Sequence, residues 1–448
     1  MSTVIDAIAA WCAAPPPTSE TARRLAQETI ADTVACLYAG RDDPSTLAVS
    51  TAFGRCENGG AALVTGGHHT PSVAALVNGT SAHALDYDDN FTPGMSHASA
   101  VILPALLALA PHVRVRGRDI VDAYLIALQA QAFVGSGVAA SHYTAGWHGT
   151  STVGSIGTAA GTAYLLGLNA DGIARALTLG ASMASGMKGQ FGAPAKPFHA
   201  GLAARNAVEA ALLAARGLHG RFEILEGPQG FVELFGGREP RGYDRAAIAA
   251  TRDHVIETEG VLPKMHPCCG STHLIIDALF DQMNETPFDA NDVVQVECLV
   301  GIANARNLAY PAPKTEMEAR FSMQYCVALA LRRKHLSLGD FTMESVAHFA
   351  TDPLMSKIAM SHYTPEQERF SHRLPHRLRI ILADGRVLER ERALPRGGLN
   401  EPFSEEERWS KFVDCLNAQE HAATMYEALT RLDEQDDLGF LTPLFTGR

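Results

Sequence analysis

The 448-residue sequence lacks the positive charge on which nucleic-acid-binding proteins depend. Its 37 lysines and arginines are outnumbered by 49 aspartates and glutamates, the formal net charge is −12, and nothing resembles a basic stripe or arm. Nucleic acid is therefore not an expected partner, because phosphates are attracted by clustered positive charge. A small anionic substrate stays compatible with this composition, since a few lysines and histidines can set the potential of one cleft.

Long hydrophobic runs are also missing. The longest run, Ala98 to Ala110, is too short to span a bilayer and contains Pro104. The N-terminus has no basic segment and carries Asp6, which argues against a signal peptide. We therefore expect a soluble protein with no membrane partner.

Cysteine pairs and nucleotide motifs are lacking as well. Eight scattered cysteines without a CxxC pair indicate neither a disulfide framework nor a structural zinc site, and reduced thiols favour a cytoplasmic location. Glycine-rich stretches such as GTSTVGSIG fall within or between helical patterns, and neither GxxxxGK[ST] nor GxSxG occurs. A nucleotide site and a serine nucleophile on an elbow are therefore not expected.

What the sequence does contain is mostly helical pattern. Over roughly the first 220 residues, helix follows helix, as in SETARRLAQETIADTVACLYAG, where Ser19 is a candidate N-cap. Many small residues in these stretches predict close packing of helices. From about residue 250, DVVQVECLVGI and RLRIILADGRVLERER predict strands, the second with a hairpin turn at its Ala-Asp-Gly. After LPRGGLNEP an amphipathic helix returns.

These patterns predict a mainly α fold in which a large all-helical domain is joined by a smaller α+β lid domain. We expect residues 1–250 to form the first part of the helical domain. Residues 251–395 would form the lid, and residues 396–448 would return to the helical domain.

Four polar clusters lie at or near predicted helix starts, where free backbone N–H groups favour anions. In chain order they contain Asp86, Asp88, Asp89 and His97; His142, Tyr143 and His148; Lys196 and His199; and Lys264, His266, Cys268, Cys269 and His273. Any one of these clusters could be structural, because aspartate often caps helices and neighbouring cysteines can pack as buried thiols. Four clusters with the same inventory indicate one shared site.

The inventory favours acid–base chemistry on a small anion. Asp88, Asp89 and His97 could bind a metal, but metal-ligand spacings such as HExxH are absent, and two lysines in the set disfavour a cation. Histidine, lysine, aspartate and tyrosine suit removal of a proton next to a carboxylate. The lysines would bind carboxylates and stabilise the negative charge that develops, so we expect no metal.

Several motifs resemble those of the MmgE/PrpD family, which includes 2-methylcitrate dehydratases, cis-aconitate decarboxylases and iminodisuccinate epimerase. They are ALDYDDN followed by SHASAVILPALLALA, then GWHGTSTVGSIGTAAG, KPFHAGLAARN, KMHPCCGSTH and EARFSMQYCVAL. The resemblance is ordered and covers nearly the whole chain. It implies a homodimer without a cofactor, whose subunit has a helical domain, a smaller α+β lid and an electropositive site between them.

Carried over motif by motif, the resemblance implies a set of site residues. These are Asp86, Asn90, His97, His148, Lys196 and Lys264, to which we add Tyr143 as a proton donor, Cys269 as an acid–base candidate and His273 as a substrate ligand. We expect Lys196 and Lys264 to bind substrate carboxylates. His97 and His148 would transfer protons, and Asp86 would orient a histidine.

One departure from the family pattern bears on the reaction. The decarboxylase pattern has a histidine five residues after the equivalent of Lys264, where this chain has Cys269. Cys269 could serve as an acid–base group if neighbouring cations lower its pKa, or it could be an inert filler. We lean to an epimerase of the iminodisuccinate type. The alternatives are a hydro-lyase of the 2-methylcitrate dehydratase type, a cis-aconitate-type decarboxylase and a non-catalytic carboxylate binder.

Overall fold

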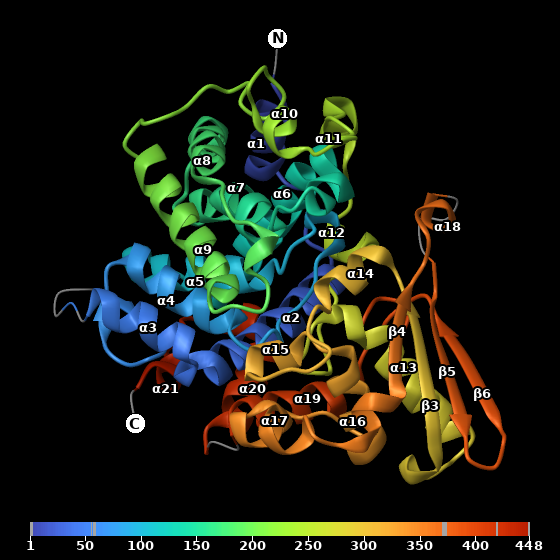
Figure 1. Cartoon of the computed structure of the whole chain (residues 1–448). Coiled ribbons are helices and arrows are strands. Elements are labelled where there is room, and N and C mark those ends of the chain that lie inside the picture. Colours follow the sequence, from blue (N-terminus) through green and yellow to red (C-terminus); the bar gives the residue numbers. More distant parts are fainter. Residues whose placement is uncertain (1–2, 55, 57–59, 370–373, 418–419, 447–448) are drawn as a thin grey trace. The chain divides into compact units, whose positions relative to one another are not determined.

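The computed structural model describes residues 3–54, 56, 60–369, 374–417 and 420–446. The chain divides into two compact units, coloured along the sequence in Figure 1. The first unit comprises residues 1–190, 194–263 and 404–448, and the second comprises residues 191–193 and 264–403.

The first unit is built of helices. Its longer helices are α1 (Val4–Ala13), α2 (Glu20–Ala39), α3 (Pro44–Phe53), α4 (Pro71–His83), α5 (Ser99–Leu109), α6 (Gly117–Thr144), α7 (Gly149–Leu165), α8 (Ala170–Met183), α9 (Ala195–Ala214) and α19 (Glu405–Cys415). Shorter elements are β1 (Ala61–Ala62), β2 (His68–His69), α10 (Phe231–Phe235), α11 (Arg245–Ala250), α12 (Val255–Thr258), α20 (Ala422–Thr430) and α21 (Thr442–Phe445). Strands β1 and β2 pair antiparallel.

Local sequence signals explain how these helices begin and pack. The predicted cap at Ser19 is confirmed, since its hydroxyl accepts a hydrogen bond from the Ala22 N–H at 2.9 Å. Small residues let α6 and α7 approach closely, as predicted. A Cβ on Gly157 would lie 2.5 Å from the backbone nitrogen of Gln131, so a larger residue there would force the two helices apart.

Helix α6 contains the one described stretch with the length and hydropathy of a membrane span, Gly117–Val138. In this structure 89% of its most apolar window is buried inside the protein. Burial of this kind is what a core helix of a helical domain shows, and a single such helix is weak support for a membrane span.

The second unit combines helices with a mixed sheet. Its helices are α13 (Gly270–Glu285), α14 (Ile302–Asn307), α15 (Glu316–Arg320), α16 (Met323–Arg333), α17 (Met343–Phe349) and α18 (Pro365–Arg369). Its strands are β3 (Val293–Val300), β4 (Ile358–His362), β5 (His376–Leu382) and β6 (Val387–Arg392). They lie in the order β4-β3-β5-β6, with β3 parallel to β4 and the other neighbours antiparallel.

The strand predictions for this unit are confirmed. The first β-rich segment forms β3, and the second forms the β5–β6 hairpin. Alternate residues Leu378, Ile380 and Leu382 of β5 are buried, as expected of a strand with one face on a core. Gly385 turns the hairpin at φ 87, a left-handed conformation that glycine adopts without strain. The chain as a whole is mainly α-helical, as predicted.

Candidate active site

In the first unit, one polar cluster is formed by the ends of four helices and the loop from α4 to α5. Helix α4 ends at His83, and α7 begins directly after His148, whose N–H donates to the Gly186 carbonyl at 3.1 Å. The second residue of α9 is Lys196. His97 lies two residues before the start of α5, and the Thr150 hydroxyl of α7 accepts its backbone N–H at 3.0 Å. Residues far apart in sequence thus converge on one place.

The loop between α4 and α5 has an unusual backbone. Asp86 has φ 51 and Met95 has φ 48, a left-handed conformation that is uncommon for residues other than glycine. Phe91 and Ser96 close the far end of the loop through two backbone hydrogen bonds of 2.7 and 3.1 Å. This folding returns the chain towards its start, so that the rings of His97 and His83 lie 4.4 Å apart.

A buried lysine forms the centre of the cluster. The Lys196 ammonium donates to Asp86 Oδ1 at 2.5 Å and to His83 Nε2 at 2.9 Å, and all three residues are almost fully buried. An ammonium has no lone pair to offer, so His83 Nε2 must be the acceptor. His83 is therefore a neutral imidazole that carries its hydrogen on Nδ1.

Asp88 fixes that tautomer. Both of its carboxylate oxygens accept from His83 Nδ1, at 2.9 and 2.8 Å, and one lies 3.4 Å from His97 Nδ1. Burial acts to raise the pKa of Asp88, but the two imidazoles hold that pKa well below its usual value. Burial lowers the pKa of His83 to about 3. At neutral pH the pair is thus a carboxylate and a neutral imidazole.

Two further histidines complete the cluster. The Nδ1 atoms of His148 and His199 lie 3.1 Å apart, so one ring donates to the other. The ring of His148 is 5.9 Å from that of His83 and 6.3 Å from that of His97. Burial, assisted by the nearby Lys196, lowers the pKa of His148 well below its usual value and that of His199 to about 4. Both rings are neutral near pH 7 and can accept a proton.

Asp89 differs from its neighbours. Burial raises its pKa to about 7, although its oxygen accepts a long 3.5 Å hydrogen bond from the N–H of Ser99, the first residue of α5. This contact fits the capping role that aspartate often has at a helix start. Asp88 instead contacts two imidazoles.

We predicted that Asp86 orients a histidine. The structure shows an ion pair between Asp86 and Lys196, and the oxygens of Asp88 lie close to the imidazoles of His83 and His97. The role of Asp86 towards a histidine stays a prediction.

Two other predicted residues of the first unit have different surroundings. Asn90 is half-buried and exchanges backbone hydrogen bonds of 2.8 and 2.9 Å with Leu262. Tyr143 lies near the end of α6, where the Lys188 ammonium is 3.3 Å from its ring centroid. Neither finding assigns a substrate contact, so both remain predictions.

His142, from the second sequence cluster, is a structural residue. Its Nδ1 donates to the Phe235 carbonyl at 2.7 Å, and its Nε2 lies 2.6 Å from the Thr152 hydroxyl. The first contact joins α6 to α10, and the second joins α6 to α7.

Lys264, Cys269 and His273 belong to the second unit. Lys264 is fully buried, and Cys269 directly precedes α13, with its N–H donating to the Arg320 carbonyl at 2.9 Å. His273 lies one turn further along α13, with Nε2 3.2 Å from the Cys268 carbonyl. Their membership of the catalytic site remains a prediction from the family motifs.

The neighbouring thiol, Cys268, has a perturbed pKa. Burial acts to raise its pKa, but a hydrogen bond from Cys326 and the proximity of His273 lower that pKa well below its usual value. The sequence analysis singled out Cys269 because it stands where the decarboxylase pattern has a histidine. The contacts of Cys268 with Cys326 and His273 could not be predicted without the structure.

The prediction missed His83 altogether and left His199 without a role. His83 lies three residues before Asp86 in SAHALDYDDN, at the end of a helix whose other residues are mostly apolar. The one feature of the sequence that could have indicated His83 is its distance of three residues from Asp86. A histidine at the end of a helix can contact the loop that follows.

The described residues include two sets of donor atoms that could hold a metal ion. One is His83, His97 and His148, and the other is His83, Asp86, Asp88 and His97; within each set the donor atoms lie within 4.8 Å of one another. Lys196 contacts two of these residues, so an ammonium already supplies positive charge to both sets.

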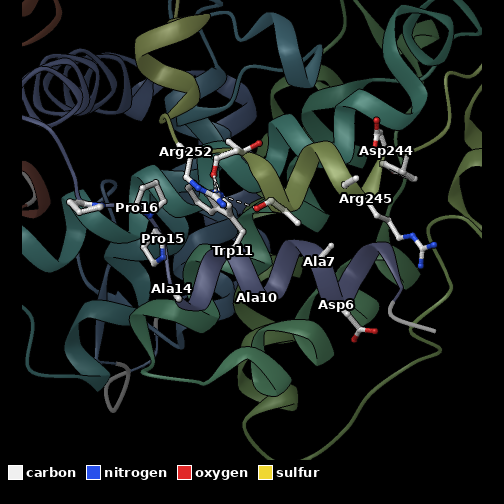
Figure 2. Close-up of a pocket in the computed structure, with 15 residues that line it drawn as sticks. Asp6, Ala7, Ala10, Trp11, Ala14, Pro15, Pro16, Asp244, Arg245 and Arg252 are labelled. Atoms are coloured by element: carbon white, nitrogen blue, oxygen red, sulfur yellow. Dashed lines mark hydrogen bonds between the residues drawn. The ribbon is translucent and has the colours of Figure 1, made fainter.

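A separate cavity of about 1280 Å³ lies in the first unit between α1 and α11 (Figure 2). Its walls include Trp11, whose indole N–H donates to the Thr251 carbonyl at 3.1 Å, and the guanidinium-bearing Arg245 and Arg252. None of the histidines of the polar cluster lines it. The cavity is therefore distinct from the candidate active site.

Comparison with known proteins agrees with this organisation. The model of the MmgE/PrpD N-terminal domain matches residues 6–243, and that of the MmgE/PrpD C-terminal domain matches residues 266–434. Cis-aconitate decarboxylase of Mus musculus is 27% identical over 396 residues, covering 84% of this chain and 79% of the relative. The Homo sapiens enzyme of that name is 26% identical over 389 residues, covering 84% and 80%. The cis-aconitate decarboxylase-like protein oryM of Aspergillus oryzae is 25% identical over 448 residues, covering 94% and 92%. The chain belongs to the MmgE/PrpD family.

Proposed function

We propose that this protein is a lyase-type enzyme that acts on a small di- or tricarboxylate through acid–base chemistry next to a carboxylate. The observation that carries the proposal is the buried Lys196–Asp86 ion pair surrounded by neutral imidazoles. The relatives named cis-aconitate decarboxylases favour a tricarboxylate such as cis-aconitate as the first substrate to test.

In this proposal Lys196 attracts a substrate carboxylate. Its ammonium is held at a fixed position by Asp86 and His83, so it need not reorganise when negative charge develops on the substrate. Loss of CO₂, or of a proton, leaves an electron pair on the carbon next to a carboxylate. A fixed cation beside that carboxylate stabilises both the developing charge and the transition state.

His97 and His148 would transfer protons. Their rings are inclined at 74° to one another, so they can face a bound substrate from different directions. In a decarboxylation one ring would first take up a proton from water and then deliver it to the carbon after CO₂ leaves. An epimerisation would use one ring as the base that removes the proton and the other, once protonated, as the acid. Positioned acid–base groups contribute about 10²–10⁴-fold each, which is the scale of loss expected when either is removed.

An epimerase remains the second candidate. Its support is Cys269, which stands where the decarboxylase pattern has a histidine. Lys264 and His273 stay in the proposal as substrate-binding residues, Asn90 as a residue at the site and Tyr143 as a proton donor. A homodimer without a cofactor is likewise proposed from the family resemblance, and a cytoplasmic location from the scattered cysteines.

Proton NMR of the purified protein in D₂O tests this proposal. Cis-aconitate, citrate-like acids and aspartate-like acids would be supplied one at a time. New olefinic signals accompanied by CO₂ release would identify a decarboxylase, and new olefinic signals without CO₂ a hydro-lyase. Deuterium exchange with stereochemical scrambling would identify an epimerase. Tight binding in calorimetry, with no chemical change in any acid, would instead indicate a non-catalytic binder.

A further inference from the structure

The donor atoms around Lys196 have the chemistry of a transition-metal site. His83, His97 and His148 offer three imidazole nitrogens within 4.8 Å of one another. Three imidazoles are a common ligand set for Zn²⁺ and similar borderline cations. Asp86 adds a carboxylate near two of these rings.

The hydrogen bond between Asp88 and His83 also resembles those that support metal-bound histidines. His83 Nδ1 donates to Asp88, which fixes the tautomer and leaves Nε2 as the electron-pair donor. A carboxylate that holds a histidine in this way is the usual support of a metal-bound imidazole. Here the cation in front of His83 Nε2 is the ammonium of Lys196, at 2.9 Å.

We propose that the donor atoms of this cluster can bind a divalent transition metal, and that the Lys196 ammonium prevents this binding in the wild type. The ammonium bonds to the donor atoms of His83 and Asp86 that a metal would use, and its charge repels a second cation. The inference does not depend on the substrate or the reaction, since it concerns only which cation the cluster holds.

Replacement of Lys196 by methionine tests the proposal, because methionine fills similar space without charge. Calorimetric titration with ZnCl₂ at pH 7 should detect one Zn²⁺ per chain, bound at least about 100-fold more tightly than by the wild type, given the repulsion removed. Zn²⁺ should also raise the thermal unfolding temperature of this variant. The matched control is Lys196→Arg, which keeps the positive charge and should not gain the site.

A second variant covers the risk that Lys196→Met folds poorly, since it leaves Asp86 buried without its cation. The double variant Asp86→Asn/Lys196→Met removes both charges and keeps the three histidines. It should bind Zn²⁺ as well, and adding His83→Gln should abolish that binding.

Three results would overturn the proposal. One is a folded Lys196→Met or Asp86→Asn/Lys196→Met protein that binds Zn²⁺ no better than Lys196→Arg does. Another is Zn²⁺ binding that persists after His83→Gln. The third is submicromolar Zn²⁺ binding by the wild type that His83→Gln abolishes, because the site would then be open with the ammonium in place.

Discussion

Two lysines are buried among the described residues of the first unit, Lys196 and Lys411. Their surroundings distinguish an ion pair that stabilises the fold from one that belongs to the candidate active site. Lys411 on α19 donates to Asp32 at 2.6 Å and to the Tyr87 carbonyl at 2.9 Å, and its ammonium lies 4.1 Å from the Tyr87 ring centroid. Lys196 is equally buried, but its partners are Asp86 and an imidazole.

The two pairs act on the same loop from different sides. Tyr87 lies between Asp86 and Asp88, so Lys411 holds the backbone of the loop while Lys196 holds one of its carboxylates. Burial acts to lower the pKa of Lys411, but Asp32 raises it overall, which keeps the ammonium charged. We infer that Lys411 positions the loop and that Lys196 contacts the substrate.

Lys196→Ala should lower kcat/KM by about 10²–10³-fold, the scale of losing a fixed charge-stabilising donor. The reason is loss of the cation beside the substrate carboxylate. Steady-state kinetics on the substrate found by NMR would measure it. If the variant were folded and retained near wild-type turnover, Lys196 would not be part of the catalytic site.

Lys411→Met should act mainly on stability. Breaking a buried ion pair by removing one partner costs about 3–5 kcal/mol, because the other charge is left uncompensated. Chemical denaturation would measure the free energy of unfolding, and Asp32→Asn/Lys411→Met should recover part of the loss. The comparison fails if Lys411→Met leaves stability unchanged yet abolishes turnover as Lys196→Ala does.

Asp88→Asn should lower turnover by about 10–100-fold, as is typical when the partner that orients a functional histidine is removed. The amide keeps the size of the carboxylate but removes the charge that fixes the tautomer of His83. The matched control is Asp89→Asn, which alters the neighbouring carboxyl without touching His83. Equal losses for both variants would contradict a specific role of Asp88.

Asp89→Asn should change the pH dependence of stability. The pKa of Asp89 is raised from 3.8 to about 7, so the folded protein keeps a proton that the unfolded chain releases. Its contribution therefore falls as pH rises from about 4 to about 7. Denaturation at several pH values should show wild-type stability decreasing relative to the variant across this window. A constant difference between the two proteins would show that Asp89 does not titrate there.

Much of the fold could be predicted from local sequence. Ser19 caps α2, and the hairpin glycine Gly385 turns β5 into β6, because both signals act within a few residues. The loop conformation at Asp86 and Met95 could not be predicted. Neither is a glycine, so the left-handed backbone is imposed by the surrounding structure rather than by the residue itself.

The residues of the candidate site could be predicted only in part, because local sequence does not show which distant residues meet in the fold. Lys196, His97 and His148 stood out as polar residues near helix starts, and the structure brings them to one cluster in the first unit. His83 could not be recognised, because its role depends on Lys196, 113 positions away in the sequence. The contacts of Asp88 with His83 and His97 likewise depend on the path of the loop, which the local sequence does not reveal.

The catalytic role of the Lys196 cluster is tested most directly by proton NMR in D₂O, comparing the wild type with Asp86→Asn/Lys196→Met on the same carboxylic acid. The wild type is predicted to convert the acid, with deuterium entering at the carbon next to a carboxylate. The variant, folded but without the charge pair, is predicted to leave the acid unchanged. Equal rates of deuterium incorporation by the two proteins would contradict the claim that this cluster performs the chemistry.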